Sequence, residues 1–131
     1  MKSTSDTTVI CDGSGYKVQL GSAVNLQWQA MGCAEKHERA HIADLMEICP
    51  EGCTDKEKGT PHPTGDDPRG CPPFEDKGTY AQWRATTECH GYSVEEECLV
   101  EQFKSADAQG KVAIRNRLNK HVRRSLKYWK C

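Results

Sequence analysis

Residues 33–42 read Cys-Ala-Glu-Lys-His-Glu-Arg-Ala-His-Ile and place His37 and His41 four positions apart. On an α-helix, residues at this spacing lie on one face, with their Cβ atoms about 6 Å apart. Two imidazoles held in this way can bind a single metal ion. The segment therefore predicts a helix that supplies two metal ligands.

Glu38 follows the first histidine directly and completes the pattern His-Glu-x-x-His. A zinc ion lowers the pKa of a bound water to near neutrality, and a neighbouring carboxylate can take the proton of that water and pass it to a leaving amine. The spacing therefore predicts a hydrolytic centre with Glu38 as its general base. The alternative is a solvated helix face that carries two histidines by chance.

The pattern around the histidines indicates that this side of the expected helix is buried. One stripe, at three- and four-residue steps, holds Cys33, His37, His41, Asp44, Leu45 and Ile48. Such a stripe is typical of a helix that buries one face, which favours the metal site over chance. We expect the helix to begin near Ser22 to Asn25, to be weakened or broken at Gly32, and to end at Ile48 because Pro50 blocks its continuation.

The eight cysteines are an even number spread along the whole chain. In a domain of 131 residues, of which 36% are hydrophobic, they predict disulfide bonds that supplement a modest core, and an oxidising compartment. Their connectivity does not follow from the sequence. The alternative is a structural zinc site built from Cys49, Cys53, Cys71 and Cys89, although the gaps between them do not reproduce the paired cysteines of such sites.

Residues 1–15 are polar and contain no apolar h-region, and no run of the sequence approaches the length of a transmembrane helix. We therefore expect no signal peptide and no membrane span in this chain. Together with the cysteines, this composition predicts a single domain over residues 1–131, cut from a longer secreted or injected protein.

Charge is distributed unevenly, although the formal net charge is −1. Residues 111–131 hold eight Lys or Arg and no acidic residue, so this stretch carries +8 and the preceding 110 residues carry −9. We expect a basic terminal helix on an acidic body. Two interpretations are open: contact with nucleic acid, or docking against the acids of the body itself.

Two short strands and a long loop flank the first helix in the sequence. Strand patterns at Val9–Cys11 and Tyr16–Leu20, separated by a turn, predict a hairpin that can lie beside an active-site cleft. Residues 50–77 are rich in proline, glycine and charge and predict a long irregular loop tied to the body by its cysteines. In that loop, His62 is either an oxyanion donor or an exposed side chain.

Helical periodicity returns in the second half of the chain. Residues 79–104 show apolar residues at three- and four-residue steps, with Gly91 marking either a break or a close approach to the first helix. A last helix is expected from about Ser105, with Asp107 in its first turn.

A catalytic zinc usually has three protein ligands and an open position for water. On the second helix, the candidates for the third ligand are Glu88, His90 and the acidic run Glu95–Glu97. A run of acidic residues is more often a solvated helix face, so at least two of those three are expected in solvent.

Residues 88–92, Glu-Cys-His-Gly-Tyr, resemble the Glu-x-x-Gly-aromatic segment that follows His-Glu-x-x-His in the gluzincin metallopeptidases. With the cysteine pattern, residues 33–103 are similar to small cysteine-rich metallopeptidase-like domains of bacterial polymorphic toxins and secretion-system effectors. The resemblance implies that Glu88 joins His37 and His41 as the third zinc ligand. Tyr92 is then either the donor to the oxyanion or a core residue one turn beyond Glu88.

The expected fold is an α-rich α+β minimal zincin: two metal-binding helices, a small β-hairpin, a long disulfide-tied loop and a basic C-terminal helix. The expected function is zinc-dependent cleavage of peptide bonds, in protein or in peptidoglycan, by an antibacterial effector with a dedicated immunity protein. The alternatives are a metal-dependent nuclease that uses the basic helix, and a non-catalytic module that keeps zinc for stability. A purely structural site has no need of Glu38, which argues against the last.

Overall fold

The computed structural model describes residues 8–11, 15–19, 28–48 and 77–131. They form an α-rich α+β fold, as predicted. The elements in chain order are β1 (Thr8–Cys11), β2 (Tyr16–Gln19), α1 (Trp28–Ile48), α2 (Lys77–Ser105), α3 (Ala108–Arg117), the π-helical turn η3 (Leu118–Val122) and α4 (Arg123–Tyr128).

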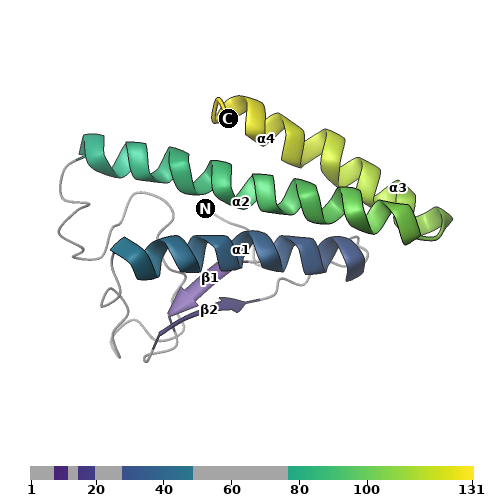
Figure 1. The fold of residues 1–131 in the computed structure, drawn as a ribbon, viewed down its shortest axis with the longest axis horizontal. Coiled ribbons are helices and arrows are strands. Elements are labelled where there is room, and N and C mark those ends of the chain that lie inside the picture. The colour runs from purple at the N-terminus through teal and green to yellow at the C-terminus, as the bar shows by residue number, and fades with distance from the viewer. Residues whose placement is uncertain (1–7, 12–14, 20–27, 49–76) are drawn as a thin grey trace.

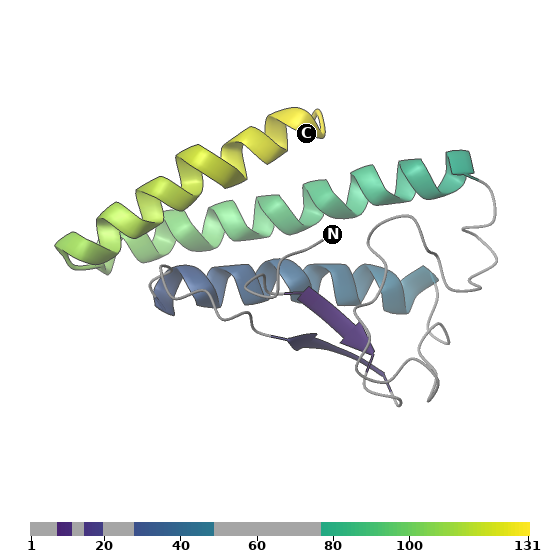
Figure 2. The same ribbon diagram turned by 180° about the vertical axis from the view of Figure 1, so that it is seen from behind.

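The elements stack in layers around the two long helices (Figure 1). The colours show that α1 and α2 lie side by side and run in opposite directions, with the β-hairpin on the far side of α1. The three last elements form one continuous helical segment, residues 108–128, which we call the C-terminal helix. Seen from behind, it runs back along α2, on the side away from the hairpin (Figure 2). The helix pair α1 and α2 is therefore covered on both sides.

The predicted hairpin is confirmed. Strands β1 and β2 pair antiparallel, with Val9 opposite Val18 and Ile10 opposite Lys17. Val9 and Ile10 are buried, and both strands contact α1. The hairpin thus adds apolar side chains beside the helix that carries the two histidines.

Helix α1 ends at Ile48, as the proline at position 50 predicts, and it is continuous from Trp28 through Gly32. The predicted start at residues 22–25 and the loop with His62 lie outside the described residues. Helix α2 matches the periodicity of residues 79–104 and passes through Gly91 without a break.

The start of the last helix differs from the prediction. The helix begins at Ala108 rather than near Ser105, and Asp107 is its N-cap rather than a first-turn residue. The Asp107 side chain accepts a hydrogen bond from the backbone N–H of Gly110 at 2.7 Å. Because this contact requires an extended residue 107, the chain turns there instead of continuing α2.

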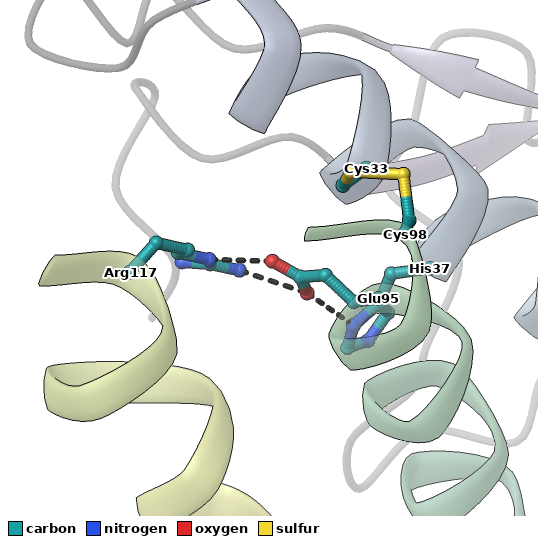
Figure 3. The surroundings of a disulfide bond; sticks show 5 residues. All are labelled: Cys33, His37, Glu95, Cys98 and Arg117. Atoms are coloured by element: carbon teal, nitrogen blue, oxygen red, sulfur yellow. Dashed lines mark hydrogen bonds and ion pairs between the residues drawn. A yellow bond between two sulfur atoms is a disulfide. The ribbon is translucent and has the colours of Figure 1, made fainter. Parts of the chain in front are cut away.

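A buried cluster joins the three helical layers. It consists of Cys33 from α1, Cys98 and Leu99 from α2, and Ile114, Leu118 and Val122 from the C-terminal helix. A disulfide bond between Cys33 and Cys98, with Cα atoms 5.5 Å apart, crosses this cluster and ties α1 to α2 (Figure 3).

A second disulfide bond joins Cys89 in α2 to Cys131 at the end of the chain. It ties the end of the chain to α2, and it removes Cys89 from the alternative structural zinc site. Cys49, Cys53 and Cys71 lie outside the described residues. Among the described helices, none is long and apolar enough to cross a membrane.

Candidate metal centre

Three side chains from α1 and α2 converge between the two helices. His37, His41 and Glu88 each offer a ligand atom, and these atoms all lie within 4.8 Å of one another. The two Nε2 atoms are 2.9 Å apart, and Nε2 of His41 lies 2.9 Å from Oε1 of Glu88. The structure therefore brings together the three residues expected to bind zinc, in a group that can hold a metal ion.

The remaining ring nitrogen of His37 is hydrogen-bonded to a buried carboxylate. Nδ1 of His37 donates to Oε1 of Glu95 at 2.8 Å, and Arg117 donates to both oxygens of the same carboxylate (Figure 3). Burial raises the pKa of Glu95, but the hydrogen bonds from His37 and Arg117 outweigh it and lower the pKa to about 2. Glu95 is therefore an ionised acceptor, and Nδ1 of His37 carries the hydrogen.

The remaining ring nitrogen of His41 is held in a similar way. Nδ1 of His41 lies 2.9 Å from Oγ1 of Thr87, and the Thr87 hydroxyl donates to Oδ2 of Asp44. Since the hydroxyl hydrogen is used toward Asp44, Thr87 accepts from Nδ1 of His41. On the outer side of the same network, Nδ1 of His90 is hydrogen-bonded to Oδ2 of Asp44 at 3.0 Å.

These partners decide which way the lone pairs of the histidines point. An imidazole that carries its single ring hydrogen on Nδ1 presents a bare lone pair at Nε2. The two Nε2 atoms and a Glu88 oxygen then lie within 4.8 Å of one another, and three acceptors this close repel one another unless a cation lies among them. Two imidazoles and one carboxylate, with their outer atoms hydrogen-bonded, are a donor set suited to a metal ion.

Gly91 allows His37 to occupy its position. A Cβ at residue 91 would lie 2.8 Å from both Cδ2 and Nε2 of the His37 ring, so the ring rests on the backbone of α2. Of the two interpretations of this glycine, the structure supports close approach to α1 and excludes a break.

Glu38, which directly follows His37 in α1, is buried, with an exposed fraction of 6%. Within the described part of the chain, its Oε2 has no hydrogen-bond partner. A buried carboxylate oxygen without a hydrogen-bond partner lowers the stability of the fold. An α-helix does not need such a group at this position, so its presence points to a function. This oxygen is available to accept a proton or a hydrogen bond from a ligand.

Tyr92 contacts the centre through its ring. The ring meets His37 edge to face, with centroids 4.3 Å apart, and the hydroxyl is hydrogen-bonded to Nε2 of His121 at 3.2 Å. Burial raises the pKa of Tyr92, against the lowering effect of a hydrogen bond from Ser125. The packing role is therefore visible in the structure, while the role as oxyanion donor stays a prediction.

The other candidates for third ligand have different positions. His90 is paired with Asp44 at the surface, and Glu95 supports His37 from the far side of its ring. Glu96 pairs with Arg123, and Glu97 is exposed, so the acidic run has one buried member, as expected. The sequence reasoning did not find the supporting roles of Thr87 and Arg117, although Glu95 lies two turns beyond Glu88 on one helix stripe.

Comparison with protein-family models, with curated proteins and with solved structures found no match. The likeness to gluzincins thus rests on the motifs alone.

Proposed function

We propose that this protein is a zinc-dependent peptidase whose metal is held by His37, His41 and Glu88. The observation that supports this most strongly is the convergence of two Nε2 lone pairs on a carboxylate, with both Nδ1 atoms already hydrogen-bonded. Imidazole nitrogen and carboxylate oxygen are ligands that zinc prefers, and three such ligands leave one position open.

Glu38 has the properties of the general base. It follows the first histidine on α1, it is buried, and its Oε2 is without a partner among the described residues. A bound zinc ion supplies a Lewis acid that makes water nucleophilic near neutral pH. Glu38 takes a proton from the attacking water and then donates it to the nitrogen of the leaving amine, so one carboxylate serves both halves of the reaction.

Tyr92 is the candidate donor for the negative charge that develops on the substrate oxygen. A tyrosine phenol is protonated at neutral pH and can donate a hydrogen bond, and burial raises the pKa of Tyr92 further. Its ring contact with His37 supports this role, in which the hydroxyl turns from His121 toward the substrate.

The test compares two glutamates of the same helix. Purified wild type is expected to carry one zinc per chain by elemental mass spectrometry and to hydrolyse peptides or peptidoglycan stem peptides. Glu38→Gln should keep the zinc and lose hydrolysis. Glu35→Gln is the matched control, because Glu35 pairs with Arg39 at the surface, and this variant should retain both properties. Loss of zinc in Glu38→Gln would contradict the assigned role.

As for the biological setting, we propose an antibacterial effector that acts in the periplasm of a neighbouring cell and is neutralised by an immunity protein covering the metal centre. Two disulfide bonds are compatible with an oxidising compartment. The substrate is then a periplasmic protein or the peptide part of peptidoglycan.

A second candidate function is a metal-dependent nuclease, which the exposed basic residues of the C-terminal helix favour. Arg117 and Arg123 are not among them, because they pair with acids of α2 and so support docking of the helix against the body. Lys120, Arg124 and Lys127 are exposed at three- and four-residue steps and can contact phosphates. Nucleic-acid binding that weakens steeply with salt, together with metal-dependent nucleic-acid cleavage, would favour the nuclease over the peptidase.

A further inference from the structure

We propose that Arg117 is a positioning residue for the metal centre, through which the C-terminal helix sets the metal affinity of His37. This inference rests on the proposed function only in requiring that His37, His41 and Glu88 bind a metal ion. It does not require peptide hydrolysis.

The contact runs from the C-terminal helix through α2 to α1 (Figure 3). Nε of Arg117 donates to Oε2 of Glu95 at 2.6 Å, and Nη2 donates to Oε1 at 3.1 Å. Oε1 also accepts the Nδ1 hydrogen of His37. A planar guanidinium that makes two parallel hydrogen bonds fixes the plane of the carboxylate, which a single point charge does not. The fixed carboxylate in turn fixes the ring of His37 and the direction of its Nε2.

Because the hydrogen bonds from Arg117 to Glu95 and from His37 to Glu95 are buried, Arg117 is needed to keep Glu95 in position. The Glu95 side chain is 0% exposed, and that of Arg117 is 24% exposed. Removing one partner of a buried ion pair leaves a charge that neither water nor protein compensates. Without Arg117, Glu95 is therefore expected to leave its position, and His37 loses the hydrogen bond that orients it.

The C-terminal helix is docked so that Arg117 is held in place. Ile114, Leu118 and Val122 bury their side chains against α1 and α2 on either side of Arg117. In a regular α-helix, Val122 would be rotated by about 80° from Ile114, because eight residues exceed two turns. The π-helical turn η3 begins directly after Arg117 and, being wider, keeps Val122 on the buried side.

The other end of this helix is attached close to a second ligand. Cys131 forms a disulfide bond with Cys89, which directly follows Glu88 in α2. The guanidinium of Arg84 also lies 5.2 Å from the centre of the Trp129 ring. The C-terminal helix is therefore connected to His37 through Glu95 and to Glu88 through Cys89, at two points that adjoin the metal centre.

A matched control is present one residue further along α2. Nε of Arg123 donates to Oε2 of Glu96 at 3.2 Å, and this pair joins the same two helical layers. Both side chains are partly in solvent, with exposed fractions of 51% and 36%. Replacing Arg123 therefore removes an arginine–glutamate pair between the layers and leaves the hydrogen bonds of Glu95 with Arg117 and His37 in place.

The experiment measures zinc affinity of the oxidised full chain by competition with a chelator, without turnover. Arg117→Lys keeps the positive charge and loses the two-pronged contact, and its zinc affinity should fall by about tenfold, the lower end of effects from residues that support a ligand. Arg123→Lys should change affinity by less than about twofold, as for an exposed pair. The visible absorption of bound Co²⁺ should shift in Arg117→Lys alone, because the His37 ligand is reoriented.

The outcomes separate this inference from the proposed function. Wild-type affinity and an unchanged Co²⁺ spectrum in Arg117→Lys would overturn it. Equal losses in Arg117→Lys and Arg123→Lys would also overturn it, since the effect would then be general docking. A wild type that binds no zinc would overturn both proposals. Tight zinc binding without peptidase or peptidoglycan hydrolysis would overturn the proposed function and leave the role of Arg117 intact.

Discussion

Gly91 lies directly against His37: a Cβ at residue 91 would be 2.8 Å from the ring atom Nε2, the atom that faces His41. Real Cβ atoms essentially never come so close to another atom, so any side chain here must displace the ring. The backbone of α2 therefore limits the ring of His37 on one side, while Glu95 holds its Nδ1. The two constraints together set the direction of one ligand.

The substitution Gly91→Ala should weaken zinc binding by at least about tenfold, because a displaced Nε2 no longer points at the other two ligands. Chelator competition on the purified variant measures the change. Gly32→Ala is the matched control, since a Cβ at Gly32 meets nothing within 4 Å. That variant should bind zinc like wild type and be more stable by about 1 kcal/mol, the helix preference of alanine over glycine. Equal zinc affinity in both variants would contradict the packing argument.

Glu88 should contribute more to metal binding than Glu95, because Glu88 offers an oxygen to the ion and Glu95 only orients a ligand. We expect Glu88→Ala to lower zinc affinity by at least about tenfold and to exceed the loss in Glu95→Gln. Glu101→Ala, at an exposed pair with Lys104, serves as the control and should have no effect. If zinc content were the same in Glu88→Ala and wild type, another residue would be the third ligand.

The two described disulfide bonds should account for much of the stability of this small domain. Cys33–Cys98 and Cys89–Cys131 close loops of 65 and 42 residues. Each is worth about 4 kcal/mol through the restricted unfolded chain. Cys33→Ser/Cys98→Ser should therefore lower the urea midpoint markedly under oxidising conditions. Alkylation of denatured, unreduced protein, read by mass spectrometry, should leave these four cysteines unlabelled.

Reduction gives a second readout on the same bonds. Opening Cys89–Cys131 releases the terminus next to Glu88, so mild reduction or Cys131→Ser should weaken zinc binding as well as stability. Labelling of most of the cysteines before reduction would show that the pairs do not form in solution.

The compartment of action is testable in a susceptible bacterium. Protein directed to the periplasm should stop growth or cause lysis, because disulfide bonds persist there, whereas cytosolic expression should be tolerated. Glu38→Ala should be harmless in both compartments and is the control for catalysis. Toxicity restricted to the cytosol would contradict the periplasmic hypothesis and favour the nuclease or a cytosolic protease.

Local patterns in the sequence predicted the elements well. The stripe through His37 and His41, the periodicity of residues 79–104 and the strand pattern at Val9–Cys11 each depend on neighbours a few positions apart, and α1, α2 and β1 follow them. Asp107 shows the limit of such reasoning. Its short side chain suits either the first turn of a helix or an N-cap. Because α2 ends only at Ser105, the next helix begins at Ala108 and Asp107 is its N-cap.

The sequence by itself determined that His37 and His41 share a helix face with Glu38 between them, because a spacing of four residues is close to one turn. Only the tertiary structure decided that Glu88 completes the group while Glu95 supports His37 from behind, and that Arg117 holds Glu95. Glu88 and Glu95 are seven residues apart and lie on the same side of α2. Glu88 reaches Nε2 of His41, and Glu95 reaches Nδ1 of His37, because of how α2 is placed along α1. That placement is set by packing and disulfide contacts between residues distant in the chain.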